Sequence, residues 1–401
     1  MEATSQRLGI SDLPKSEKPA DSLIPFNVPF LDEQEVQAAV AAVQQKALGG
    51  NGAYTHQVEQ ALKEMTNSPY AFFVTSCTHA MELALMALGI KPGDEVVLPS
   101  FTFTSTATCI VRQGAVPVFA DIDPTTWCLD PEDVARSCGP KTRAILAVHY
   151  AGHPAPIRRI ASVAPSSFVL EDAAHAFGAE AGGQAAGTLG DGGCFSFHIT
   201  KNLTCGEGGA LLLRSKEVAQ RAEMMREKGT NRAQFLRKEV PRYSWVSEGS
   251  SFVASDLLAA ILAEQFKKRE HILQRRGEIW RRYHQAFAPL AEDGLLTLPV
   301  IEPGVQSSYH IFAVLIPPKR QAGLVERLRA RGIEASSHYV PLHTSPFWRQ
   351  VSGGRQRPLP VTERIGSSLL RLPIYPSLTV AQQERVIEVF TDLLKEGYVS
   401  D

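Results

Sequence analysis

The hydrophobic positions of the chain alternate between short apolar runs and longer stretches with helical spacing. Seven short runs, most of them apolar throughout and rich in β-branched or aromatic residues, predict strands at residues 71–75, 95–99, 117–120, 144–149, 167–171, 194–197 and 210–213. Such runs are typical of strands that are covered on both faces. Between these strands, residues 78–88 and 105–113 have apolar residues at helical spacing, which predicts two helices. The alternation predicts an α/β fold with one large, mainly parallel, seven-stranded sheet.

The second half of the chain opens with a long helical pattern over residues 255–290, whose polar face is dense in Arg and Lys. We interpret its basic run, KKREHILQRR, as a solvated helix face with acidic neighbours rather than a nucleic-acid site. Beyond it, the pattern predicts an α+β region with a strand at 309–316, a helix at 322–331, a second strand at 334–338 and a C-terminal helix at 380–396.

This order predicts two domains, a large one at residues 23–270 and a smaller C-terminal one at 271–401. Residues 1–22 mix charges with Ser, Pro and Gly, and are predicted to form a flexible extension. The segment 345–360 is rich in Gly, Pro and Arg, which predicts a mobile surface loop.

Composition narrows the classes of partner. Of 401 residues, 44% are hydrophobic and 21% charged, which is ordinary for a globular protein. Lys and Arg number 41 against 42 Asp and Glu, so no net charge attracts the chain to nucleic acid or an anionic membrane. No apolar run is long enough for a membrane span, and no secretory signal is recognisable. The six cysteines form no CxxC pair, so we expect reduced thiols and a cytoplasmic protein that binds small molecules.

Polar residues where strands end carry the candidate chemistry. Ser76, Cys77 and Thr78 lie between a strand and a helix, where free backbone N–H groups can bind phosphate; the alternative is ordinary helix capping. Asp172 follows an apolar strand, at the sheet edge where ligands of α/β folds bind, although an acidic residue there is often a helix cap.

A third candidate is Lys201, in the string CFSFHITKNLTCGEGGALL between two predicted strands. Ser196 precedes it, and the glycines that follow allow a close backbone approach to a bound group; the alternative is a solvated lysine in a Gly-rich hairpin. The motifs GxxxxGK[ST], GxGxxG, GxSxG and HExxH are missing from the corresponding places. A phosphate cradle, a strand-end carboxylate and a lysine together match the needs of pyridoxal phosphate (PLP), with no metal.

The strings EDAAH at Glu171 and SFHITK running to GEGG at Gly206 resemble the hallmarks of the DegT/DnrJ/EryC1/StrS sugar aminotransferases, of PLP fold type I. The resemblance extends from IPFNVPF at Ile24 to the last helix. The longer strings GCFSFHITKN, REKGTNRAQF, GSSFVASDL and HYVPLH are similar to the branch of dTDP-4-amino-4,6-dideoxygalactose transaminases, which aminates dTDP-4-keto-6-deoxy-D-glucose.

The resemblance implies a role for each candidate residue. Lys201 would be the Schiff-base lysine and proton carrier, and Asp172 would hold the pyridinium nitrogen. The residues around the phosphate would be Ser76, Cys77, Thr78 and Ser196, with Cys77 contributing its backbone amide. His175 stands where the family has Gln or His beside the ring, and could hydrogen-bond the phenolic oxygen. Phe103 would stack on the cofactor; its alternative is core packing.

The resemblance also implies a homodimer with shared active sites. Ser251 replaces the Asn that in many relatives reaches the phosphate of the partner subunit, a replacement found in the branch itself. Lys228 and Arg232 would clamp the diphosphate of the substrate, although a solvated loop is an equal alternative.

The substrates implied are a dTDP-sugar and L-glutamate, with the amino group placed on C4. Three alternatives stay open: an aminotransferase for another keto-sugar nucleotide, a sugar dehydratase of the same family, and a PLP-binding regulator without turnover. Dehydratase members carry His at the lysine position, so Lys201 favours transamination.

Overall fold

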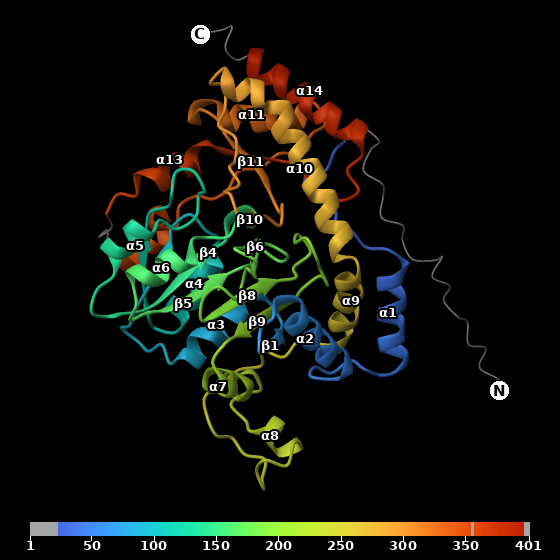
Figure 1. Cartoon of the computed structure of the whole chain (residues 1–401), viewed down its shortest axis with the longest axis vertical. Coiled ribbons are helices and arrows are strands. Elements are labelled where there is room, and N and C mark those ends of the chain that lie inside the picture. Colours follow the sequence, from blue (N-terminus) through green and yellow to red (C-terminus); the bar gives the residue numbers. More distant parts are fainter. Residues whose placement is uncertain (1–22, 354–356, 397–401) are drawn as a thin grey trace, which may run out of the picture.

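The structure is a computed structural model that describes residues 23–353 and 357–396. A seven-stranded sheet forms its centre, and a smaller region of helices and two strands lies beyond one edge of it (Figure 1). The extension predicted for residues 1–22 lies outside the described residues.

The central sheet confirms the predicted strands, each within two residues of its expected ends. They are β1 (Tyr70–Val74), β2 (Glu95–Pro99), β3 (Val116–Ala120), β4 (Thr142–Val148), β5 (Phe168–Asp172), β8 (Gly192–Ser196) and β9 (Gly209–Leu213). Their spatial order is β1-β9-β8-β5-β4-β2-β3. Only β9 runs antiparallel to its neighbours in this sheet, so the carboxyl ends of the other six strands meet at one edge.

Helices cover both faces of the sheet. One face packs against α3 (Cys77–Leu88), α4 (Thr104–Arg112) and α7 (Lys216–Arg226), and the other against α2 (Ala53–Thr66), α5 (Pro131–Ser137), α6 (Ile157–Val163) and α9 (Asp256–Lys267). Successive residues of β1 serve the two cores in turn: Phe72 belongs to the first and Phe73 to the second. This double burial explains why the strands read as unbroken apolar runs.

The long helical pattern is two helices, which corrects the prediction of one. α9 ends before Lys268, and α10 (Arg269–Glu292) begins directly after it. The Lys268 ammonium binds Asp32 Oδ1 at 2.6 Å and Glu35 Oε2 at 2.7 Å, next to and within α1 (Glu33–Gln44). These ion pairs tie the junction to a distant part of the chain.

The C-terminal region packs α10, α11 (Pro318–Ala330) and α14 (Val380–Glu396) around a two-stranded sheet of β11 (Phe312–Leu315) and β12 (Leu369–Leu372). The predicted strand at 334–338 is wrong: that segment makes only an isolated bridge from Ser336 to Arg371. Its sequence, EASSH, is polar, whereas β12 is almost wholly apolar and buried. The domain boundary at 270 stays a prediction.

The segment predicted as a mobile loop, residues 345–360, contains a helix in its described part. α12 (Pro346–Ser352) is capped by Ser345, whose Oγ accepts from the backbone N of Trp348. The Trp348 ring packs edge-on against Phe119 at 5.0 Å, and Leu359 is buried. The prediction of a mobile loop therefore misses this helix and the two buried side chains, Trp348 and Leu359.

Several short elements are absent from the sequence-based expectation. They are β6 (Glu180–Ala181), β7 (Gln184–Ala185), β10 (Val305–Gln306), α8 (Arg232–Leu236), α13 (Pro360–Ser368) and the 3₁₀ helices η2 (Tyr150–Gly152) and η3 (Leu342–Thr344). The six cysteines are free thiols, and all but Cys138 are buried. None of the described helices combines the length and the apolar character needed to cross a membrane.

Asp256, the first residue of α9, ties that helix to the start of α2. Its buried carboxylate accepts from the backbone N–H groups of Gly52, Tyr54 and Thr55 and from the Thr55 hydroxyl, at 2.6–3.2 Å. A carboxylate at a helix N-terminus also interacts favourably with the helix dipole.

We therefore expect Asp256→Ala to lower the free energy of unfolding by about 3 kcal/mol or more, because three backbone donors lose their acceptor inside the protein. Asp293→Ala, at the exposed end of α10, is the control, with an expected change within about 0.5 kcal/mol. Urea denaturation would measure both, and equal midpoints for the two variants would contradict this role of Asp256.

Candidate active site

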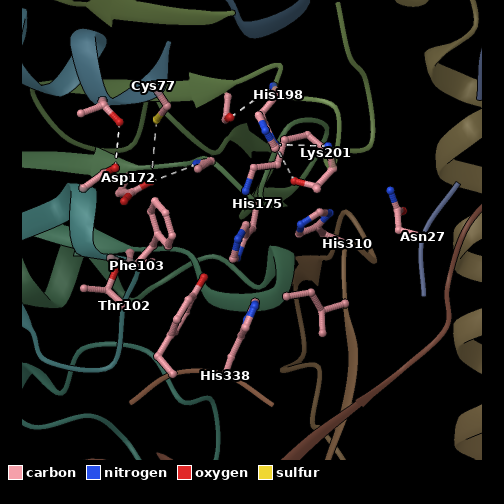
Figure 2. A pocket seen from close by; sticks show the side chains of 18 of the residues that line it. Asn27, Cys77, Thr102, Phe103, Asp172, His175, His198, Lys201, His310 and His338 are labelled. Atoms are coloured by element: carbon pink, nitrogen blue, oxygen red, sulfur yellow. Dashed lines mark hydrogen bonds between the residues drawn. The ribbon is translucent and has the colours of Figure 1, made fainter. Parts of the chain in front are cut away.

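A cavity of about 520 Å³ lies at the carboxyl ends of β4, β5 and β8 (Figure 2). The first turn of α3 and strand β12 complete its wall. Ligands of open α/β sheets bind at this edge. Of the predicted site residues, the cavity brings together Ser76, Cys77, Thr78, Phe103, Asp172, His175, Ser196 and Lys201.

Asp172, the last residue of β5, holds a buried carboxylate at one end of the cavity. Oδ2 accepts from the Thr106 hydroxyl at 2.8 Å, and Oδ1 accepts from the backbone N of Ala174 at 3.2 Å. The Cys77 thiol lies 4.0 Å from Oδ1 (Figure 2). No helix starts at Asp172, so the capping alternative does not describe it, and within the described residues its carboxylate forms no ion pair. Because these hydrogen-bond donors are uncharged, the carboxylate keeps its negative charge and can bind a cation in the cavity.

Lys201 lies in the turn after β8, where its backbone N donates to His198 O at 2.9 Å. Its side chain lines the cavity rather than pointing into bulk water. Burial lowers the pKa of Lys201 to about 8, although the nearby Cys77 and Asp172 act in the opposite direction. With this pKa of about 8, roughly a tenth of the amine is neutral at pH 7, far more than for a lysine with the ordinary pKa of ~10.4, so this lysine can act as a nucleophile and a base.

The start of α3 combines capping with an open anion site. Ser76 Oγ accepts from the backbone N of His79 at 3.1 Å, so the hydroxyl does cap the helix. The first N–H groups of a helix have no carbonyl partner within it, and here Ser76, Cys77 and Thr78 border the cavity. The two interpretations of this segment are therefore compatible.

Gly209 lets strand β9 pass close to the start of α3, a role that the sequence did not indicate. A Cβ at this position would lie 2.2 Å from the carbonyl carbon of Ser76 and 2.4 Å from the backbone N of Cys77. The close backbone approach that the glycines permit is thus, at Gly209, an approach of β9 to the start of α3. It fixes where the anion site stands relative to the sheet.

Phe103 and His175, two rings in the cavity wall, each have a group without a protein partner. Phe103 is 59% exposed, which rules out core packing as its role. His175 is buried, and its Nδ1 has no hydrogen-bond partner among the residues that the structure describes. Its ring lies 4.5 Å from that of His310, and burial keeps the pKa of His175 well below its usual value, so the ring is neutral.

These features fit PLP: a carboxylate for the pyridinium nitrogen, a helix terminus for the phosphate, an exposed aromatic face for the ring, and an orphaned ring nitrogen of His175 for a polar substituent.

The site residues that the sequence missed are Thr106, His310, His338 and Arg371. Thr106 stands one helical turn from Phe103 in PSFTFTST, and His338 lies in the string HYVPLH. Arg371 has no local signal, because it interrupts an apolar run.

Ser251, Lys228 and Arg232 lie outside the cavity of the single chain, and all three are exposed. Ser251 forms a β-bridge with Glu227, whose carboxylate also binds Arg232 at 2.7 Å. Their roles toward a partner subunit and a diphosphate stay predictions.

The lowered pKa of Lys201 can be tested in the cofactor-free protein. With an amine-acylating reagent, labelling of Lys201 should rise with a midpoint near pH 8, because the neutral amine is the reactive form. Exposed lysines, with an ordinary pKa of ~10.4, provide the internal control. Peptide mass spectrometry across a pH series measures both, and a shared midpoint would contradict the proposed environment.

Comparison with known proteins agrees with this geometry. The profile of the DegT/DnrJ/EryC1/StrS aminotransferase family matches residues 29–391. The spore coat polysaccharide biosynthesis protein SpsC of Bacillus subtilis is 33% identical over 383 residues, which cover 93% of this chain and 97% of SpsC. Two crystal structures are each 31% identical. The aminotransferase TlmJ from Streptoalloteichus hindustanus has a TM-score of 0.86, covering 94% of this chain and 100% of TlmJ. DesV from S. venezuelae, in complex with a ketimine intermediate, has a TM-score of 0.83, covering 93% of this chain and 99% of DesV.

The family match spans nearly the whole chain, and the fold and the cavity agree with it. The chain therefore belongs to the DegT/DnrJ/EryC1/StrS aminotransferase family, and it is a PLP-dependent sugar transaminase.

Proposed function

We propose that the protein moves the amino group of L-glutamate to C4 of dTDP-4-keto-6-deoxy-D-glucose. The products are 2-oxoglutarate and a dTDP-4-amino-4,6-dideoxy-D-hexose of the galacto or gluco series. The observation that carries the chemistry is the convergence of Lys201 and Asp172 on one cavity. Its volume of about 520 Å³ lies in the range of small-molecule sites.

We assign the cofactor contacts to the residues whose groups are free to make them. The Asp172 carboxylate would hold the protonated ring nitrogen, and the N–H groups at the start of α3, with Ser196, would bind the phosphate. Phe103 would cover one ring face, and His175 Nδ1 would meet a polar ring substituent. When bound, PLP supplies an electron sink for the carbon that loses its proton.

Lys201 is the proton carrier of the proposed reaction. Its amine, with a pKa of about 8, can accept the proton from the α-carbon of the donor and return it in the second half-reaction. Thr106 and the Ala174 N–H keep the Asp172 carboxylate oriented throughout. A ping-pong sequence follows, because donor and acceptor use the same cavity in turn.

Two resemblances support the sugar substrate. SpsC is named for polysaccharide biosynthesis, and the strings GCFSFHITKN and HYVPLH resemble the branch that aminates the dTDP-linked keto sugar. The alternatives are another keto-sugar nucleotide or a non-catalytic regulator. Retention of Lys201 with a lowered pKa favours turnover over the second.

The decisive experiment is to incubate the enzyme with dTDP-4-keto-6-deoxy-D-glucose and L-glutamate and to follow 2-oxoglutarate and the sugar product by NMR. We expect a C4 amine, whose ring coupling constants give its configuration. Asp172→Asn should retain cofactor yet lose at least ~100-fold in kcat, because an amide cannot hold the pyridinium proton. An unchanged sugar, with 2-oxoglutarate absent, would refute the substrate, and near wild-type activity of Asp172→Asn would refute its role.

We also propose a cytoplasmic homodimer. The arm that follows α7 projects from the body at the bottom of Figure 1, and it exposes large apolar side chains at Phe235, Leu236, Tyr243, Trp245 and Val246. Clustered exposed apolar residues of this kind mark interaction surfaces. Lys228 and Arg232 stand at the base of the same arm, so a second chain seated there would come close to them.

Trp245, 80% exposed, should be a strong contributor to that interface. We expect Trp245→Ser to raise the dimer dissociation constant by at least ~10-fold, measured by sedimentation velocity. Phe347→Ser, which removes an exposed ring of α12, is the matched control and should leave association unchanged. An unaffected Trp245→Ser dimer would place the interface elsewhere.

A further inference from the structure

Ser100 and His343 form a buried pair that joins two distant parts of the chain. Ser100 follows β2, and His343 lies in η3, 243 positions later. The Ser100 carbonyl oxygen accepts from the backbone N of Leu342 at 3.0 Å, and the Ser100 hydroxyl accepts from the backbone N of His343 at 2.9 Å. A third hydrogen bond joins this hydroxyl to Nδ1 of His343 at 2.7 Å.

The surroundings decide the direction of that third hydrogen bond. The Ser100 hydroxyl already accepts from the His343 backbone, so its own hydrogen needs an acceptor, and among the described residues Nδ1 of His343 supplies it. His343 therefore carries its proton on Nε2, which donates to Glu363 Oε1 at 3.2 Å. The same carboxylate oxygen accepts from the backbone N of Leu359 at 3.1 Å. A chain of donors thus runs from Ser100 through His343 to α13, and it fixes the plane of the imidazole.

The pair adjoins an aromatic contact in the cavity wall. Phe101, the residue after Ser100, has its ring 5.6 Å from that of Tyr339, and the ring of Phe103 lies 6.5 Å from the same tyrosine. Phe103 and Tyr339 both line the cavity. The hydrogen bonds between Ser100 and His343 therefore hold together two segments that each contribute a ring to the site.

Helix α13 contacts the segment 339–343 at two points. Glu363 accepts from His343, and one turn later Gly366 passes close to Tyr339: a Cβ at Gly366 would lie 2.9 Å from the Tyr339 carbonyl oxygen. Val340, between these two points, is exposed and contributes little packing. The segment is therefore held near Tyr339 and at His343 rather than at Val340.

The segment that begins at Ser100 carries side chains that the site depends on. Phe103 presents an exposed ring face, and Thr102 Oγ1 lies 2.8 Å from Thr106 Oγ1. Thr106 in turn donates to Asp172 Oδ2 at 2.8 Å. Thr102 and Phe103 stand at the Asp172 end of the cavity (Figure 2). A shift of Ser100 would therefore displace both the ring face and the support of the Asp172 carboxylate.

Resting on the proposed function, we propose that His343 is a positioning residue for the cofactor. By fixing Ser100, it sets the place of Phe103 against the cofactor ring and of Thr106 beside Asp172. His343 itself does not line the cavity, so it touches neither substrate. The cofactor takes part in both half-reactions, so loss of this hydrogen bond slows both to the same extent. A displacement of about 1 Å in such a site can cost ~100-fold in rate.

Two conservative variants separate this role from simple packing. In His343→Asn, the amide oxygen can take the place of Nδ1 and accept from Ser100, but the side chain is too short to reach Glu363. In His343→Gln, the amide nitrogen can take the place of Nε2 toward Glu363, and the Ser100 hydroxyl is left without an acceptor. Gln is closer to His in volume, so a packing role predicts that Gln is tolerated better, and a positioning role predicts that Asn is.

The first measurement is hydrogen exchange of the cofactor-free protein, followed by mass spectrometry. Peptides over residues 100–106 and 338–343 should exchange about 10-fold faster in His343→Gln than in wild type, because a buried hydroxyl has lost its partner. In His343→Asn the same peptides should stay within about 3-fold of wild type.

The second measurement is binding of pyridoxamine phosphate, which forms no covalent bond with the protein. Its dissociation constant should rise about 10-fold in His343→Gln and stay within about 3-fold of wild type in His343→Asn. His284→Ala is the control, because it removes an imidazole that stacks on Trp280 at 5.0 Å in the C-terminal region. The control should change neither the exchange of residues 100–106 nor this binding.

The third measurement follows each half-reaction of the holoenzyme by the absorption of the cofactor, with L-glutamate or with the dTDP-linked amino sugar. In His343→Gln, the maximal rate of both should fall about 10-fold, with KM changed by less than about 3-fold. Ser100→Ala should show the same loss. The double variant should lose no more than either single one, because both changes remove the same hydrogen bond.

Several outcomes would overturn the assignment. Better retention of function by His343→Gln than by His343→Asn would make His343 a packing residue. Unchanged exchange over residues 100–106 in His343→Gln would show that it does not order this segment, and a loss confined to one half-reaction would assign it to a substrate. A wild type that reacts with glutamate but not with the sugar would refute the proposed sugar substrate alone, since hydrogen exchange and pyridoxamine phosphate binding do not involve the sugar.

Discussion

The site depends on charges that the fold keeps apart. Asp172 would ordinarily be neutralised by a cation, yet it receives the Thr106 hydroxyl and the Ala174 N–H instead. Lys201 and Arg371 face the same cavity, and neither has a carboxylate partner within the described chain. Uncompensated buried charges cost stability, and they persist only when the surrounding backbone fixes them. Here each is fixed by a different element: the end of β5, the turn after β8, and β12.

The large sheet and its strand-end residues were predictable because their signals are local. A strand buried on both faces is an unbroken apolar run, and the polar residue that follows it marks the sheet edge. Asp172, and Ser76 to Thr78, were found in this way. Lys201 was predictable from the nearby Ser196 and glycines. One of these glycines, Gly209, approaches the start of α3 instead of a bound group.

The errors arose where tertiary contacts override local pattern. Helical spacing continues through Lys268, and the break there coincides with ion pairs to Asp32 and Glu35, more than two hundred positions earlier. Residues 334–338 follow a helix like a strand of an α+β unit, but β12 supplies the partner of β11. Thr106 reaches Asp172 across 66 positions, and Arg371 meets His338 across 33, so no short window of sequence contains either pair.

The neutral histidines complete the electrostatic logic of the cavity. Asn202 Nδ2 donates to Ser308 O at 2.8 Å, which leaves its Oδ1 to accept from His310 Nδ1, also at 2.8 Å. His310 therefore carries its proton on Nδ1, and its Nε2 is a bare acceptor. Burial, together with the charges of Lys201 and Arg371, lowers the pKa of both His175 and His310. The same cations thus prevent the two imidazoles from adding further positive charge to the cavity.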